Sequence, residues 1–150
     1  MKILPGFLND MRARGYITSG PFRGRRIPQN VQNIVIASYV RSIGFDFVLS
    51  RAEYYISDEQ SRLQLHAMLS DTCEVFVFFS IWQLPVDRNA RIRFFKQALF
   101  LSKSIHFASE RVVISDTSDI ASLELIMSLD ASISNVYNQK EAKGLLLSYL

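Results

Sequence analysis

The stretch EVFVFFS, residues Glu74–Ser80, is an almost unbroken apolar run between two polar residues. A strand that is covered by helices on both faces of a parallel sheet has this composition, because neither of its faces meets water. The run therefore predicts a central strand. It also predicts that the neighbouring strands are joined to it by helical crossovers on the two faces.

Segments typical of strands and helices alternate on both sides of this run. Strand patterns occur at 15–19, 45–50, 104–108 and 111–115, and helix patterns at 28–43, 61–71, 87–102 and 116–129, the last with Asp116 or Ser118 as its N-cap. This order predicts an α/β fold with three layers, αβα, around a mostly parallel sheet of four or five strands. In the helix at 28–43, the residues with near-helical spacing that we expect to face the sheet are Val31, Ile34, Val35, Tyr39 and Ile43.

The composition is that of one globular domain. The chain has 150 residues, of which 49% are hydrophobic and 21% charged. We predict a single domain over 1–150, with its core at about 14–129. The tail, 130–150, ends in the apolar sequence GLLLSYL and is interpreted as a helix that packs on the domain or on a second copy, so that a homo-oligomer is expected.

Several classes of site and location are disfavoured by the sequence. No apolar run approaches the length of about 18–20 residues that a membrane span needs. Cys73 is the only cysteine, so no internal disulfide forms, and one cysteine cannot make a metal site alone. No GxGxxG, P-loop or CxxC motif occurs, and we expect neither a cofactor nor a metal. Together these features favour the reducing cytoplasm.

The charge of the chain is concentrated at its start. Residues 1–51 hold eight Lys or Arg against two Asp or Glu, whereas residues 52–150 hold nine against twelve. Arg23, Arg25 and Arg26 stand between the first predicted strand and the helix that begins near Pro28. A helix N-terminus offers free N–H groups and the positive end of its dipole, so this loop predicts an anion site. The alternative is a loop of solvated or ion-paired arginines.

Further candidate residues follow the predicted strands, because ligands of parallel α/β sheets bind beyond the carboxyl ends of the strands. The binding candidates, besides the three arginines, are Ser19, Gln29, Gln32, Asn33, Glu53, Tyr54 and Gln83. Their amides, hydroxyls and carboxylate suit sugar hydroxyls. Trp82 is either a stacking platform or a plug. His106 and Glu110, four residues apart after the fourth strand, are the candidate catalytic acid–base pair. For each of these residues the alternative is a structural role.

Four segments of the chain resemble the catalytic domain of serine recombinases (resolvases). They are GYITS, PQNVQNIVIASYVRSIGF, SRLQLHAML and EVFVFFSIWQLPVDRNARIRFFKQAL, and they span about residues 14–128. The resemblance implies a resolvase-like or flavodoxin-like fold. The position of the family's nucleophile falls at Gly20, or at Ser19 with a slip of one residue. Trp82 and Gln83 stand where the family has an Asp–Arg pair, and only Arg62 is kept. No helix-turn-helix segment follows, so strand transfer and a nucleic-acid partner are not expected.

A second resemblance is to sporadic carbohydrate cluster proteins, an uncharacterised family whose genes lie among those for surface polysaccharide and O-antigen synthesis. It rests on RGYITS, PFRGRRIPQNVQNIVI, FVLS followed by AEYY, FFSIWQLPVDRNAR and IHFASE, over most of residues 14–111. It implies a protein of that pathway, which would bind a sugar phosphate or nucleotide sugar at the strand ends, with or without catalysis. The alternative is a non-catalytic interaction or assembly module. A DNA-strand-transferring relative of the resolvases is the third.

Overall fold

The computed structural model describes residues 11–54 and 62–148. The strands are β1 (Arg12–Thr18), β2 (Asp46–Glu53), β3 (Val75–Phe78), β4 (Ser104–Phe107) and β5 (Val112–Ile114). The helices are α1 (Gln29–Ser42), α2 (Leu63–Met68), the 3-10 turn η2 (Ile81–Gln83), α3 (Arg88–Phe100) and α4 (Thr117–Ser148). The chain divides into two compact units, residues 1–116 and 117–150, and each is described by itself.

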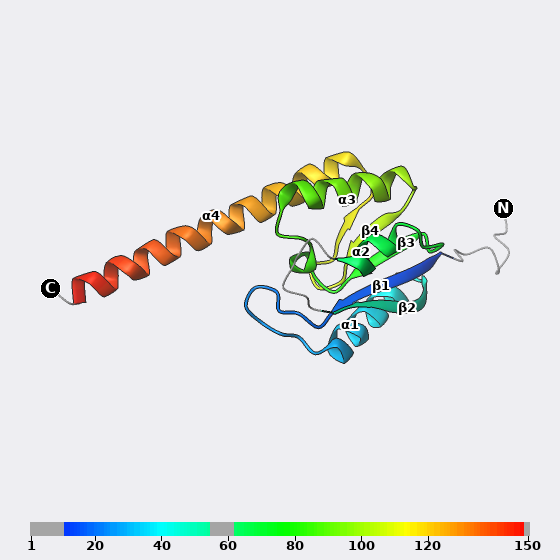
Figure 1. Ribbon diagram of the computed structural model, residues 1–150, viewed down its shortest axis with the longest axis horizontal. Coiled ribbons are helices and arrows are strands. Elements are labelled where there is room, and N and C mark those ends of the chain that lie inside the picture. The colour runs from blue at the N-terminus through cyan, green and yellow to red at the C-terminus, as the bar shows by residue number, and fades with distance from the viewer. Residues whose placement is uncertain (1–10, 55–61, 149–150) are drawn as a thin grey trace. The chain divides into compact units, whose positions relative to one another are not determined.

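The first unit contains a five-stranded sheet in the order β2-β1-β3-β4-β5 (Figure 1). β1 to β4 pair in parallel, and only β5 is antiparallel to its neighbour. β3 lies in the middle and all four of its residues are buried, so the prediction of a central strand at Glu74–Ser80 is confirmed. The α/β fold with a mostly parallel sheet is confirmed as well.

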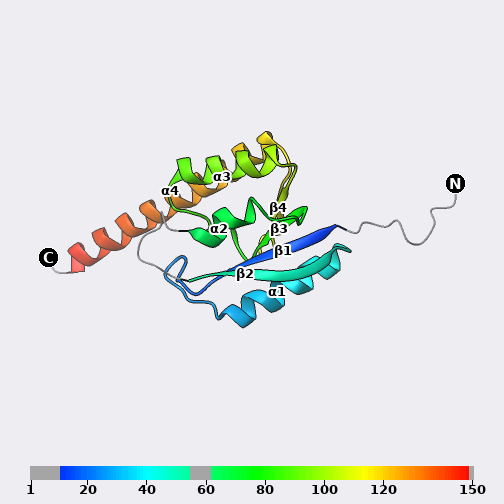
Figure 2. The ribbon, with the colours of Figure 1, turned by 45° about the vertical axis from the view of Figure 1, so that its right-hand side comes forward.

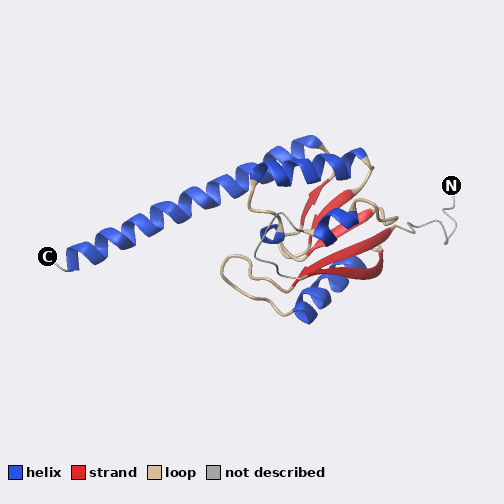
Figure 3. Ribbon diagram, viewed as in Figure 1, coloured by secondary structure: helices blue, strands red, loops and turns tan. Residues whose placement is uncertain are grey.

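Within this unit the helices cover both faces of the sheet, as predicted. Figures 2 and 3 show α1 on one face of the sheet and α2 and α3 on the other. Alternate residues of each strand therefore join two different cores. Val75 and Val77 belong to the cluster of α1, with Ile36 and Val40. On the other face the buried rings gather around Phe78, which lies near Tyr16, Phe94 and Phe107.

The face that α1 turns to the sheet differs from the prediction. Ile34 is 65% exposed and Val31 is also exposed. The buried residues of α1 are Gln32, Ile36, Tyr39 and Val40. The buried stripe is thus rotated so that it begins at a glutamine. A hydrophobicity pattern cannot find that stripe, because it treats Gln32 as a surface residue.

One glycine allows β1 and β2 to approach closely. The pairing of these strands shifts register between Ala13 and Gly15. A Cβ atom on Gly15 would lie 2.1 Å from the hydroxyl oxygen of Ser50 and 3.2 Å from Ile36. Arg14 stabilises the irregularity, since its guanidinium donates to the carbonyl of Leu49. Only glycine fits this register.

The second unit is the long helix α4, drawn from yellow to red in Figure 1. The sequence predicts a helix ending near Leu129 and a separate tail, but the helix continues without a break to Ser148. Neither proline nor a turn signal interrupts residues 130–143, so nothing in the chain ends the helix there. The single domain predicted for 1–150 stays a prediction. In the part of the chain that the structure describes, no helix has the length and apolar character of a membrane span.

Candidate functional site

The switch in strand order lies between β1 and β3, because the chain leaves β1 toward β2 on one side and β3 pairs with β1 on the other. Beyond the carboxyl ends of these two strands, open α/β sheets place their ligands. Here two buried glutamines meet. The amide nitrogen of Gln83 donates to the amide oxygen of Gln32 over 2.7 Å. We call this pair the glutamine bridge.

The glutamine bridge uses its amides to hold the backbone. Gln32 accepts from the N–H of Thr18 and donates to the carbonyls of Thr18 and Ile27. Gln83 accepts from the N–H groups of Phe79 and Ser80. Gln32 is fully buried and Gln83 is 2% exposed. Both oxygens and both amide hydrogens of Gln32 therefore have partners inside the fold. The bridge occupies the crevice in which the sequence placed a ligand.

Glu53 also has a structural position. It is buried at the carboxyl end of β2, and its Oε2 accepts from the N–H groups of Gln64 and Leu65 at 2.9 and 3.1 Å. The carboxylate thus caps the first turn of α2, where the helix dipole favours negative charge. The same oxygen accepts from the hydroxyl of Tyr16 at 3.3 Å. Burial raises the pKa of Tyr16 far above its ordinary value, although nearby Arg62 opposes the shift.

His106 faces α1 from the middle of the buried strand β4. Its Nδ1 lies 2.8 Å from the hydroxyl of Tyr39, and its Nε2 lies 3.2 Å from the hydroxyl of Ser104. Burial lowers the pKa of His106 to about 4, because the charged imidazolium loses its hydration there. The ring is therefore neutral at pH 7.

Glu110 has different partners from His106. It accepts from the hydroxyl of Ser80 at 2.6 Å and from the N–H of Ile81 at 3.2 Å, and so holds the start of η2. The structure joins His106 and Glu110 to separate groups, and no hydrogen bond links them among the described residues. Their catalytic role stays a prediction that this geometry does not assemble. Within 11–54 and 62–148, no group of His, Cys, Asp and Glu is arranged to hold a metal ion.

The basic loop forms a small hairpin. The backbones of Phe22 and Arg25 exchange two hydrogen bonds of 3.0 and 3.1 Å. The residues between them, Arg23 and Gly24, have φ values of 51° and 71°, as both central residues of a type I′ turn must. We call residues Phe22–Arg26 the arginine hairpin. Phe22 anchors it, since its ring centroid lies 5.9 Å from that of Phe79.

The arginines of this hairpin are exposed. The guanidinium carbon of Arg23 lies 4.0 Å from the ring centroid of Trp82. The side chains of Arg25 and Arg26 make no hydrogen bond or ion pair to another described residue. Nearby in sequence, the amide nitrogen of Gln29 is buried and has no partner among the described residues. Arg25 and Arg26 are thus the members of the predicted site whose charges remain available.

The remaining candidates do not converge on one point. Asn33 accepts from the hydroxyl of Ser50 at 2.6 Å, which ties α1 to β2. The N–H of Ser19 donates to the carbonyl of Glu53 just beyond β1. Tyr54 is exposed. The binding roles of these three residues stay predictions.

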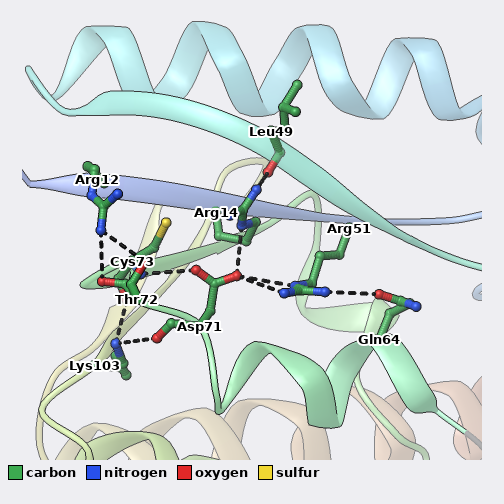
Figure 4. A network of polar contacts seen from close by, with 9 residues as sticks. All are labelled: Arg12, Arg14, Leu49, Arg51, Gln64, Asp71, Thr72, Cys73 and Lys103. Carbon is green, nitrogen blue, oxygen red and sulfur yellow. Dashed lines mark hydrogen bonds and ion pairs between the residues drawn. The ribbon is translucent and has the colours of Figure 1, made fainter.

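An ionic network around Asp71 was not found from the sequence (Figure 4). Its Oδ2 accepts from Arg14 on β1 and from Arg51 on β2, at 2.9 and 3.1 Å. Its Oδ1 accepts from the N–H of Cys73, and the ammonium of Lys103 donates to the carbonyls of Asp71 and Cys73. Burial alone would raise the pKa of Asp71, but these donors together lower it well below its ordinary value. The network ties the segment before β3 to two strands.

Comparison with solved structures shows what this fold resembles. The N-terminal catalytic domain of TP901-1 integrase matches with a TM-score of 0.58 and 10% sequence identity, over 82% of this chain and 98% of that one. A resolvase family site-specific recombinase from Streptococcus pneumoniae matches with the same score and identity, over 86% of this chain and 95% of that one. No family model matches the sequence, and no curated protein matches it either. The chain therefore has the fold of resolvase-type catalytic domains.

This comparison corrects the predicted function. The matching structures are recombinases, not proteins of polysaccharide synthesis. The site agrees with the correction, because Gln32, Gln83 and Glu53, which were assigned to a sugar, bind the fold itself. The prediction of a sugar phosphate or nucleotide sugar ligand is therefore wrong. The resemblance to sporadic carbohydrate cluster proteins stays a prediction without support from a family model.

Proposed function

We propose that this chain is a nucleic-acid-binding protein that holds phosphate groups at the arginine hairpin without cutting the strand. The observation that carries the proposal is the pair of exposed side chains, Arg25 and Arg26, on a structured turn. Guanidinium groups bind phosphate oxygens bidentately, and such contacts supply most of the affinity of non-specific nucleic-acid binding.

The fold supports this choice of anion. The two solved structures it resembles are an integrase and a site-specific recombinase. Strand cleavage is not part of the proposal, because Gly20 occupies the nucleophile position implied by the resemblance and the glutamine bridge fills the crevice. The sequence disfavoured nucleic acid on the ground that the recombinase residues are missing. That argument bears on cleavage and leaves phosphate binding open.

The test is a binding measurement with a fluorescent 30-mer oligonucleotide at several salt concentrations. Each charge-assisted hydrogen bond is worth roughly 1.5–3 kcal/mol, so Arg25→Ala/Arg26→Ala should weaken binding by at least about tenfold for each arginine that holds a phosphate in the parent. The dependence on salt should become shallower by about one unit of slope per phosphate released. Thermal unfolding should not change, because exposed charges contribute little to stability.

A matched control removes two positive charges elsewhere. Arg41 and Arg93 are also exposed, and Arg41→Ala/Arg93→Ala should bind the oligonucleotide nearly as well as the parent. Equal affinity of the hairpin variant and the parent would refute the proposal. So would an absence of binding by the parent at low salt.

A second observation favours self-association. Along α4, four exposed apolar residues follow the spacing 3-4-3, namely Ile126, Leu129, Ile133 and Val136. We call them the apolar stripe. Tyr137 adjoins it and is exposed as well. Such spacing places side chains along one seam of a helix, as in paired helices. We infer that α4 pairs with α4 of a second copy, so that the protein binds nucleic acid as a dimer.

A further inference from the structure

The only tryptophan of the chain lies under an arginine of the hairpin. Trp82 is half-buried in η2, directly after β3. The guanidinium carbon of Arg23 is 4.0 Å from its ring centroid, the distance of stacked planes. We call this pair the Arg23–Trp82 stack. It combines a flat surface with positive charge at the tip of the arginine hairpin.

The indole is held firmly from below. The backbone of η2 is fixed by Ser80, whose hydroxyl accepts from the N–H of Trp82, and by Glu110, which accepts from Ile81. Gln83, next to Trp82, is buried in the glutamine bridge. A ring on such a support keeps its position when a ligand arrives, and little conformational entropy is lost on binding.

The backbone of Arg23 also points to a role for its side chain. Its φ of 51° lies in the left-handed region, where asparagine and glycine are favoured and other residues are uncommon. An arginine there costs the turn some stability. The contact with Trp82 is the visible compensation, and it places a guanidinium beside the two phosphate-binding candidates, Arg25 and Arg26.

We propose that the Arg23–Trp82 stack takes an unpaired nucleobase, so that the protein prefers single-stranded over double-stranded nucleic acid. Bases stack on arginine planes and on aromatic rings alike. In a duplex, the faces of the bases are already covered by their neighbours. A single strand can place one base on the stack while its phosphates reach Arg25 and Arg26. This inference rests on the function proposed above and specifies the form of its ligand.

The experiment compares three probes by the fluorescence of Trp82. They are a thymine 12-mer, the same length of duplex, and inorganic polyphosphate, which has phosphates but no bases. The 12-mer should quench Trp82 and bind at least about tenfold more tightly than the duplex, since stacking of one base contributes about that factor. Polyphosphate should bind without comparable quenching.

Two variants locate the effect, with binding followed by the anisotropy of a labelled 12-mer. Arg23→Asn keeps a residue that tolerates the turn and removes the guanidinium. Trp82→Leu removes the ring. Each should lose about tenfold affinity for the 12-mer and little affinity for polyphosphate. Trp82→Phe keeps a ring and should retain most of the binding. Thermal unfolding of each variant checks that the hairpin and η2 remain folded.

The outcomes separate this inference from the function beneath it. Equal affinity for the 12-mer and the duplex, or unchanged binding by folded Arg23→Asn, would overturn base stacking while leaving phosphate binding intact. If neither oligonucleotide nor polyphosphate binds the parent, both proposals fail.

Discussion

Replacing Leu129 and Ile133 together by lysine should leave the chain monomeric at concentrations where the parent is a dimer. Burial of a Leu or Ile side chain is worth about 1.5 kcal/mol or more, and a symmetric dimer loses two such residues from each copy. The dissociation constant should rise at least about 100-fold. Analytical ultracentrifugation at micromolar concentration measures the change against a monomer mass of 17.2 kDa.

The matched control places the same charges on the opposite side of α4. Ala131 and Asn135 have the same four-residue separation and are exposed. At about 100° per residue they face away from the apolar stripe. Ala131→Lys/Asn135→Lys should therefore remain a dimer. A parent that sediments as a monomer at micromolar concentration would contradict the pairing of α4, and the arginine hairpin would then have to act in a single copy.

Asp71→Asn should cost about 2–3 kcal/mol of the free energy of unfolding at pH 7. The side chain of Asp71 is 3% exposed and pairs with Arg14 and Arg51, whose side chains are 20% and 33% exposed. Removing one partner of a buried ion pair leaves the other charges without compensation. The partial exposure of both arginines places the loss below that of a fully buried pair. Urea unfolding measures it, and Asp46→Asn, at an exposed carboxylate, should change stability by less than about 0.5 kcal/mol.

The loss should depend on pH with a definite sign. The fold lowers the pKa of Asp71, since the donors from Arg14, Arg51 and Cys73 outweigh the effect of burial. An unfolded aspartate has a pKa of about 3.9, so the contribution of Asp71 is complete above that pH and declines as the pH falls below it. The stability difference between parent and Asp71→Asn should therefore shrink between about pH 5 and pH 2.5. A difference that stays constant over this range would show that the carboxylate charge is not the cause.

The architecture could be predicted because it depends on patterns that are local in sequence. The apolar run at Glu74–Ser80 marks the middle of the sheet, and alternation of strand and helix patterns specifies parallel order. The length of α4 was missed for a local reason too. The pattern after Leu129 lacks a buried face, and a helix that is exposed along most of its length gives no periodic burial signal.

The site could not be predicted, because its polar residues are satisfied by partners distant in the chain. Gln32 and Gln83 look like surface amides until the fold brings them together from 51 residues apart. Asp71 finds Arg14 and Arg51 at separations of 57 and 20 residues. The charges of the arginine hairpin were visible in the sequence, whereas the position of Arg23 above Trp82 depends on the turn that Gly24 permits.

The glutamine bridge has a consequence for the evolution of this chain. A mutation at Gln32 alone strands the N–H of Thr18 and the amide of Gln83 in a dry interior, and a mutation at Gln83 alone strands the N–H groups of Phe79 and Ser80. Neither step is tolerable singly, so the two positions should co-vary in related sequences. A lineage that replaced both with small residues would reopen the crevice between β1 and β3, and there a binding pocket could arise again.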